Sequence, residues 1–236
     1  AYMHINFKTV FLVLPLALIV SSSIAFAKKQ QYTEIEVGNG GSISGIIQFD
    51  GQAPPPVSVN LNNEKNSEFC LENANPNKQG ELLIHHVEVK GKKLKDAVIF
   101  IQNITKGKSW DDKTLKINFK NCQAFPKVDV VRKTPRVLTN NLVTIENHDS
   151  GVLHNPKGFS IGEKTRKIFF KKWLLNKGTK VDVTNSMKHL KKGRDSHFYI
   201  ECEQHLWMSV SAKVIWNPYH DVSKNDGSFK IDQIPP

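Results

Sequence analysis

The stretch that decides the fold reads HFYIECEQHLWMSVSAKVIW and covers residues 197–216. Its first part alternates, so that Phe198, Ile200 and Cys202 share one face of a predicted strand, and its last part repeats the apolar alternation. Cys202 therefore stands at the end of one core strand. The residues that follow it, 203–208, form a short loop that leads into a second core strand.

This loop carries a thiol, an imidazole and a thioether at Cys202, His205 and Met208. These donors form a soft set that selects copper, and a second imidazole from elsewhere would complete a trigonal site with a weak axial sulfur. Two histidines, His148 and His154, follow an apolar predicted strand upstream. The residue pattern by itself leaves both open as the fourth ligand. A structural zinc site would favour more cysteines and no methionine.

Further β-rich runs alternate with turn residues, and neither an internal repeat nor a long capped helix is visible. Their spacing predicts an all-β, antiparallel sandwich. Residues 184–193 are compatible with one helical turn or with a loop, and Asp226-Gly227 predicts a tight turn before a last strand. Together with the two core strands already described, the predicted strands are 43–49, 82–89, 97–101, 115–119, 128–131, 142–146, 168–173, 180–183, 197–202 and 210–216.

The first 27 residues have the pattern of an export signal. A weakly basic start precedes an apolar run at 10–20, and Ala25-Phe26-Ala27 is a small-x-small cleavage site, so the mature chain is predicted to begin at Lys28. An uncleaved membrane anchor is the alternative, but the apolar run is shorter than the roughly 20 residues that span a bilayer. We expect a mature chain without a transmembrane segment, in the periplasm or another extracytoplasmic space.

Three cysteines in an exported chain suggest one disulfide and one remaining thiol. Cys70 and Cys122 lie in polar surroundings, whereas Cys202 is close to potential metal ligands. We therefore expect Cys70 and Cys122 to pair and Cys202 to remain a thiolate ligand. A disulfide from Cys202 to one of the other two is the alternative.

The chain is strongly basic, with a formal net charge of +11. Removal of residues 1–27, which hold one lysine and no acidic residue, leaves +10. The lysines are scattered and not interleaved with stacking aromatics, and an exported protein rarely meets nucleic acid, so we expect no nucleic-acid partner. The denser basic run at 164–194 predicts a face that attracts an acidic partner.

The spacing Cys202-x-x-His205-x-x-Met208, with Asn147-His148-Asp149 and His154-Asn155 upstream, resembles the cupredoxins, the type 1 blue-copper family, and among them the amicyanin and plastocyanin-like proteins. The flanks resemble exported cupredoxin-like proteins of the methylamine-utilisation type. The likeness implies a cupredoxin-like Greek-key β-sandwich that holds one type 1 copper ion. Two departures are Pro156-Lys157-Gly158 after the upstream pair and Leu206 where a proline is usual.

By this resemblance, His154, Cys202, His205 and Met208 take the ligand roles. Asn155 would tie the two ligand loops together by hydrogen bonding. The resemblance also implies that His154 is the buried histidine and that His205 lies nearest solvent. Leu206 and Trp207 would then form the apolar surface that a partner contacts, with Trp207 more often a packing residue than an electron relay.

The resemblance also divides the chain into segments. We expect a signal peptide at 1–27, an N-terminal β extension at 28–94, a cupredoxin-like domain at 95–216 and a C-terminal β-hairpin extension at 217–236. The last three are expected to form one compact unit.

The ligand set predicts a non-enzymatic carrier of single electrons between redox partners. The expected partner is a redox protein, such as a c-type cytochrome or a periplasmic dehydrogenase, with an acidic surface. A copper carrier or storage protein, or a structural envelope protein on the same fold, is the alternative, because a fold does not determine a function. A copper enzyme such as a multicopper oxidase would need a further histidine-rich cluster, which the sequence does not supply.

Overall fold

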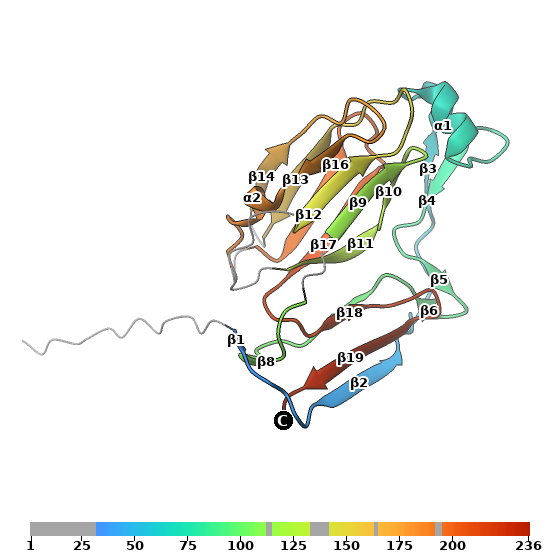
Figure 1. The fold of residues 1–236 in the computed structure, drawn as a ribbon. Coiled ribbons are helices and arrows are strands. Elements are labelled where there is room, and N and C mark those ends of the chain that lie inside the picture. Colours follow the sequence, from blue (N-terminus) through green and yellow to red (C-terminus); the bar gives the residue numbers. More distant parts are fainter. Residues whose placement is uncertain (1–31, 112–114, 133–141, 163–164, 192–194) are drawn as a thin grey trace, which may run out of the picture. The chain divides into compact units, whose positions relative to one another are not determined.

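The computed structural model describes residues 32–111, 115–132, 142–162, 165–191 and 195–236 (Figure 1). The predicted signal peptide at 1–27 lies outside the described residues, as do Lys164 and Arg194 at the two ends of the predicted basic run. Among the described residues, no helix has the length and apolar character needed to cross a bilayer.

Two sheets form a sandwich, and the predicted all-β class is confirmed (Figure 1). The smaller sheet has the strand order β10-β9-β12-β15 and the larger one the order β11-β17-β16-β13-β14. The smaller sheet consists of β9 (Leu115–Lys120), β10 (Gln123–Phe125), β12 (Val143–Asn147) and β15 (Lys180–Asp182). The larger sheet consists of β11 (Val128–Arg132), β13 (Pro156–Ile161), β14 (Arg166–Lys171), β16 (His197–Cys202) and β17 (Ser209–Ile215).

The main hydrophobic core lies between these two sheets. Side chains from β9 and β12 meet side chains from β16 and β17 in a single buried cluster. Phe198, Ile200 and Cys202 are each 0% exposed, as their alternation predicts. The strand that ends at Cys202 is therefore fixed by burial of its whole inner face, which also places the thiol inside the core.

The expectation of a purely antiparallel sandwich is wrong for two pairs of strands. β12 runs parallel to β9, and β11 runs parallel to β17. Neither pair is consecutive in the chain, and a parallel pair requires such a crossover connection. Strand positions alone do not reveal which strands become neighbours, so the sequence pattern could not show these pairings.

Smaller pairs of strands join the two ends of the chain. The C-terminal strands do not pair with each other, in contrast to the expected hairpin, because β19 pairs with β2 and β18 with β7. A second hydrophobic cluster around the fully buried Tyr219 fills this region. The elements are β1 (Thr33–Glu34), β2 (Gly41–Ile46), β5 (Val89–Lys90), β6 (Lys93–Leu94), β7 (Val98–Phe100), β8 (Lys106–Gly107), β18 (His220–Val222) and β19 (Ser228–Ile234).

A third part of the fold, residues 57–84, covers one end of the sandwich, and we call it the cap. It consists of β3 (Val57–Asn60), η1 (Leu61–Asn63), α1 (Ser67–Asn73) and β4 (Glu81–Ile84), and β3 pairs with β4. Its own small cluster of buried residues includes Leu61, Cys70 and Leu82. The second helix, α2 (Thr184–Met187), is the single turn that the sequence left open.

Candidate metal centre

The loop between β16 and β17 is closed by its own backbone. The Cys202 amide donates to the Met208 carbonyl at 3.0 Å, and the Met208 amide donates to the His205 carbonyl at 2.9 Å. These bonds turn the chain back within a few residues of the strand end. The side chains of Cys202 and His205 are thereby directed to the same buried end of the core.

His154 reaches the same place from the neighbouring strand. It precedes β13, whose first residue Pro156 pairs with Cys202 of β16. Its amide and carbonyl bond to Leu174 at 3.1 and 2.7 Å, which fixes the backbone just before the strand begins. The register of β13 on β16 therefore brings an imidazole from the upstream segment beside the thiol.

His154, Cys202 and His205 offer three donor atoms that all lie within 4.8 Å of one another. Nδ1 of each histidine is 3.7 Å from the Cys202 sulfur, and the centroids of the two imidazole rings are 5.1 Å apart. All three residues are 0% exposed. A thiolate and two imidazoles that converge in a buried pocket form a donor set suited to a soft transition metal such as copper.

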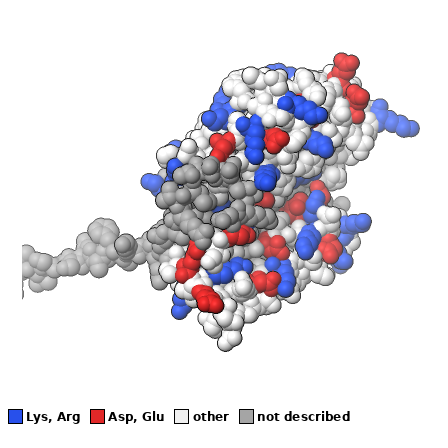
Figure 2. All heavy atoms as spheres, in the orientation of Figure 1, with Lys and Arg blue, Asp and Glu red and all other residues white. Residues whose placement is uncertain are grey.

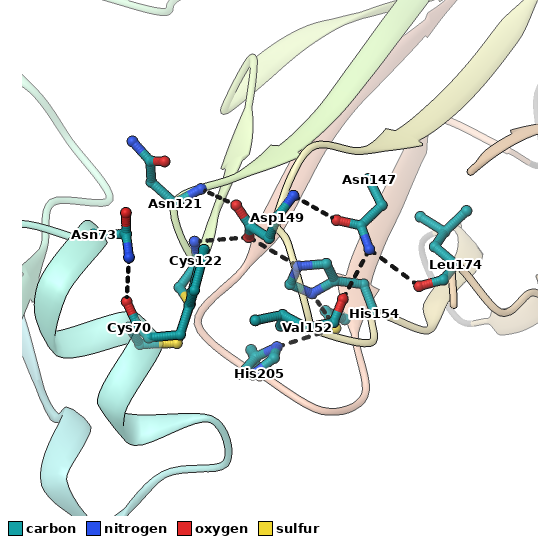
Figure 3. Close-up of polar contacts among 12 residues, drawn as sticks. Cys70, Asn73, Asn121, Cys122, Asn147, Asp149, Val152, His154, Leu174 and His205 are labelled. Atoms are coloured by element: carbon teal, nitrogen blue, oxygen red, sulfur yellow. Dashed lines mark hydrogen bonds and ion pairs between the residues drawn. A yellow bond between two sulfur atoms is a disulfide. The ribbon is translucent and has the colours of Figure 1, made fainter. Parts of the chain in front are cut away.

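The outer nitrogen of each imidazole is held by another group, as Figure 3 shows for His154. Nε2 of His154 bonds to the Asp149 carboxylate at 3.0 Å, and Nε2 of His205 bonds to the Lys65 carbonyl at 3.2 Å. An Nε2 that donates its proton leaves Nδ1 as the lone-pair donor. Both Nδ1 atoms therefore face the sulfur in the form that a metal ion binds.

Asp149 is itself fixed by a turn from the smaller sheet (Figure 3). Its carboxylate accepts from the amides of Asn121 and Cys122 at 2.5 and 3.0 Å, and its own amide donates to the Asn147 side chain at 2.8 Å. Burial alone would raise the pKa of Asp149, but the bonds from His154 and the two amides lower it below its ordinary value. Asp149 thus remains a carboxylate that orients His154.

The thiol is prepared for metal binding by its surroundings. Burial raises the pKa of Cys202, but its hydrogen bonds with His154 and His205 and the one from the Asn155 backbone amide outweigh it and bring the pKa to about 6. The pKa of His154 is raised, because its bonds to Asp149 and Cys202 outweigh the burial that lowers it. A thiolate near neutral pH is the form that binds a metal ion.

In the metal-free protein we expect Cys202 to lose its proton near pH 6 instead of near its ordinary value of 9.0. Because the folded pKa is the lower one, ionisation of Cys202 stabilises the fold increasingly as the pH rises from about 6 towards 9. An NMR titration of protein labelled at the cysteine Cβ carbons measures this directly. The disulfide carbons of Cys70 and Cys122 serve as internal controls that should not shift. A midpoint close to 9 would contradict the prediction.

The remaining predicted site residues occupy distinct places. Met208 is 1% exposed and belongs to the same core cluster as Cys202, and its role as an axial ligand stays a prediction. The side-chain amide of Asn155 donates to the Glu203 carboxylate at 2.9 Å, and the backbone carbonyl of Asn155 accepts from the backbone amide of Glu203 at 3.1 Å. Asn155 therefore joins the His154 segment to the Cys202 loop. His148, the alternative ligand, bonds to Asn118 at 2.9 Å and lies outside the cluster.

A disulfide joins Cys70 to Cys122, and Cys202 is the free, buried cysteine. The disulfide connects helix α1 of the cap to the same turn that holds Asp149 (Figure 3).

The expectation that His205 lies nearest solvent is wrong. Its side chain is 0% exposed, because the cap places the Lys65 carbonyl over its outer nitrogen. The cupredoxin resemblance covers 95–216 and contains no counterpart of the cap, so only the position of Cys70 in the sequence indicates this cover. Asp149 is a second residue whose role the sequence did not show, although it lies in the Asn-x-Asp pattern.

Leu206 and Trp207, the predicted partner contacts, differ in their surroundings. Leu206 is 70% exposed. Trp207 is half-buried, its ring centroid is 5.2 Å from that of His205, and its indole N–H donates to the Cys122 carbonyl at 2.8 Å. Trp207 therefore lies between His205 and the turn that carries Cys122.

Comparison with known proteins finds no matching family model and no matching curated protein. Among solved structures, a novel purple cupredoxin from Nitrosopumilus maritimus is similar over 43% of this chain and 99% of its own, with 19% identity and a TM-score of 0.29. A Cu-containing nitrite reductase from Thermus scotoductus SA-01 is similar over 58% of this chain and 35% of its own, with 12% identity and a TM-score of 0.29. Such low scores do not determine a function.

Proposed function

We propose that this protein binds one copper ion through His154, Cys202 and His205, with Met208 as a weak axial ligand, and carries single electrons between redox partners. Copper would supply the change between its two oxidation states. The observation that carries the proposal is the convergence of two imidazoles and one thiol within 4.8 Å in a fully buried pocket. This donor set is typical of blue-copper electron-transfer sites.

The rigid support of the ligands favours electron transfer. Asp149 holds the outer nitrogen of His154, and the Lys65 carbonyl holds that of His205. Asn155 fixes the spacing between the two ligand segments through Glu203. Ligands held in this way keep their positions when the charge at the centre changes, which keeps the rearrangement during electron transfer small.

Burial of the donor residues favours an electron carrier over an enzyme or a copper donor. Each of the three is 0% exposed, so a substrate has no direct contact with them. A protein that delivers copper needs a ligand that a receiving protein can displace. The cap, which covers His205 and is joined to the sandwich by a disulfide, opposes such release.

The proposed partner is an acidic redox protein, such as a c-type cytochrome or a periplasmic dehydrogenase. The net charge of +10 expected for the mature chain would steer such a partner at low ionic strength. Figure 2 shows basic side chains interspersed with acidic ones on the visible face, which suits a transient encounter better than a tight complex. We place the protein outside the cytoplasm, as the predicted signal peptide and the disulfide suggest.

The test is to load the purified protein with copper, record its visible and electron paramagnetic resonance spectra, and measure its metal content. We expect one copper ion per chain and an intense thiolate-to-copper absorption. Repeated reduction with ascorbate and reoxidation should leave the bound copper unchanged.

The outcomes separate the candidate functions. A copper-loaded protein without the intense visible absorption would contradict the blue-copper site. Loss of copper to a chelator during the first reduction would favour a copper carrier over an electron carrier. Preference for zinc over copper in metal competition would contradict both the electron carrier and the copper carrier.

A further inference from the structure

The imidazole of His205 is fully buried and has neighbours at its ring faces and at both of its nitrogens. Its Nδ1 faces the sulfur of Cys202, and its ring lies against the rings of His154 and Trp207 at 5.1 and 5.2 Å. Its outer nitrogen bonds to the Lys65 carbonyl at 3.2 Å. A partner therefore cannot touch the edge of this imidazole, and electrons need another exit.

The cap that closes this side is firmly attached to the sandwich. The disulfide from Cys70 to Cys122 is covalent, and Lys65 Nζ also donates to Gln204 in the metal loop at 2.7 Å. Gln123 donates to the Ala74 carbonyl at 3.3 Å. Both cysteines are 0% exposed, so the disulfide that holds the cap is shielded from solvent.

Trp207 is an aromatic neighbour of His205 that also lines a surface pocket. The aromatic neighbours of the two histidines among the described residues are Phe119, which is 0% exposed, and the half-buried Trp207. One side of the indole lies against His205, and the residue also lines a surface pocket. The pocket lies between the end of β4, strand β10 and the start of β17, and its lining includes Ile84, His85, His86, Lys127, Trp207 and Ser209.

The pocket suits an acidic group of a partner. Its lining includes Lys127 and two histidines, and none of its lining residues is Asp or Glu. Lys127 is bound to Glu88 at 3.2 Å, but Glu88 also bonds to Lys95 at 2.9 Å, so one carboxylate is shared between two ammonium groups. Asp96 lies 3.6 Å from Lys95 and is not among the residues that line the pocket.

We propose that an acidic redox protein docks at this pocket and that Trp207, in place of the edge of His205, provides the electronic contact to the metal centre. The inference rests on the proposed function and deepens it by naming the surface. Trp207 need not itself be oxidised, because its ring shortens the gap that the electron crosses. The rival surface is Leu206, which is next to His205 in the chain and 70% exposed.

The first experiment uses the reduced, copper-loaded full chain, labelled with ¹⁵N, and the paramagnetic anion hexacyanochromate as a docking probe. We expect line broadening at the amides of His85, His86 and Lys127 and at the indole N–H of Trp207. Broadening centred on Leu206, with none at the pocket, would overturn the proposal.

The second experiment measures the rate at which hexacyanoferrate oxidises the reduced protein. We expect Lys127→Glu to slow this reaction by about tenfold, within the range of electrostatic steering, and to speed oxidation by a cationic cobalt complex. The matched control is Lys177→Glu, the same change at an exposed lysine outside the pocket, which should have a smaller effect. Equal effects of the two substitutions would contradict docking at the pocket.

The third measurement tests Trp207 itself. Trp207→Leu should slow oxidation by hexacyanoferrate by about tenfold while the thiolate-to-copper absorption remains. Rates equal to those of the wild type would overturn the role of Trp207. The absorption also separates the two proposals, since its absence from the wild type would contradict the blue-copper site, whereas its presence with broadening only at Leu206 would contradict the pocket alone.

Discussion

Cys202→Ser should abolish the intense visible absorption of the copper-loaded protein completely. The sulfur lies 3.7 Å from Nδ1 of both His154 and His205, so it is the donor that joins the two imidazoles in one site. Serine has nearly the same shape, but its hydroxyl does not ionise near neutral pH. The thiolate with its pKa of about 6 is therefore lost together with its soft sulfur.

Copper affinity should also fall in the same variant. Loss of a group that hydrogen-bonds to a metal ligand lowers metal affinity by roughly 10–100-fold, and loss of the ligand itself should lower it by more. Visible spectra and copper titration in the presence of a competing chelator measure both effects. The double substitution Cys70→Ser with Cys122→Ser is the matched control for the absorption alone, because it replaces two cysteines outside the ligand cluster and should retain the band. A Cys202→Ser protein that keeps the intense band would show that another thiolate is the ligand.

The same double substitution has the second large expected effect, on stability and on closure of the site. The two cysteines are 52 residues apart, and loop-closure entropy for that length gives a stabilisation of about 4 kcal/mol. Urea unfolding of the metal-free protein should show a loss of about this size. The serine at position 122 still has an amide to offer Asp149, so the anchor of His154 is retained in this variant.

Without the disulfide, the cap should also hold His205 less firmly. Only non-covalent contacts, such as the bond from Lys65 to Gln204, would then keep the Lys65 carbonyl over the imidazole. We expect copper to pass to a chelator about 10–100-fold more readily. Hydrogen exchange at the amides of 61–73 should accelerate. Unchanged exchange and unchanged copper retention would show that the cap is held without its disulfide.

The parts of this fold that follow local sequence rules could be predicted. The alternation that ends at Cys202 predicts a strand at 197–202, and β16 has those bounds. Cys202 and His205 could be proposed together because they lie in one loop between two predicted strands, whereas the choice of His154 over His148 comes from the cupredoxin resemblance. These features depend on a few neighbouring residues and on burial.

The parts that depend on long-range contacts could not be predicted. Strand β13 begins with Pro156 and contains Gly158, which in isolation indicate a turn. The structure explains the glycine, because a Cβ there would overlap the ring of Phe170 on β14. The cap was missed for a similar reason. Apart from Cys70, the residues of the cap carry no pattern that indicates what they cover. The cap contacts His205 through the backbone carbonyl of Lys65, and because every residue has such a carbonyl, the contact leaves no mark in the sequence.

The turn that connects β9 to β10 has a consequence for the metal centre. Asn121 and Cys122 have φ values of 54 and 53°, in the left-handed region, which costs a residue such as cysteine about 1–2 kcal/mol and asparagine less. In this conformation both amides face the Asp149 carboxylate. The turn is an anion-binding site, and the anion that it binds is a carboxylate of the same chain. The orientation of the His154 imidazole therefore depends on two residues that are not metal ligands themselves. Substitutions in this turn should change the geometry of the metal site.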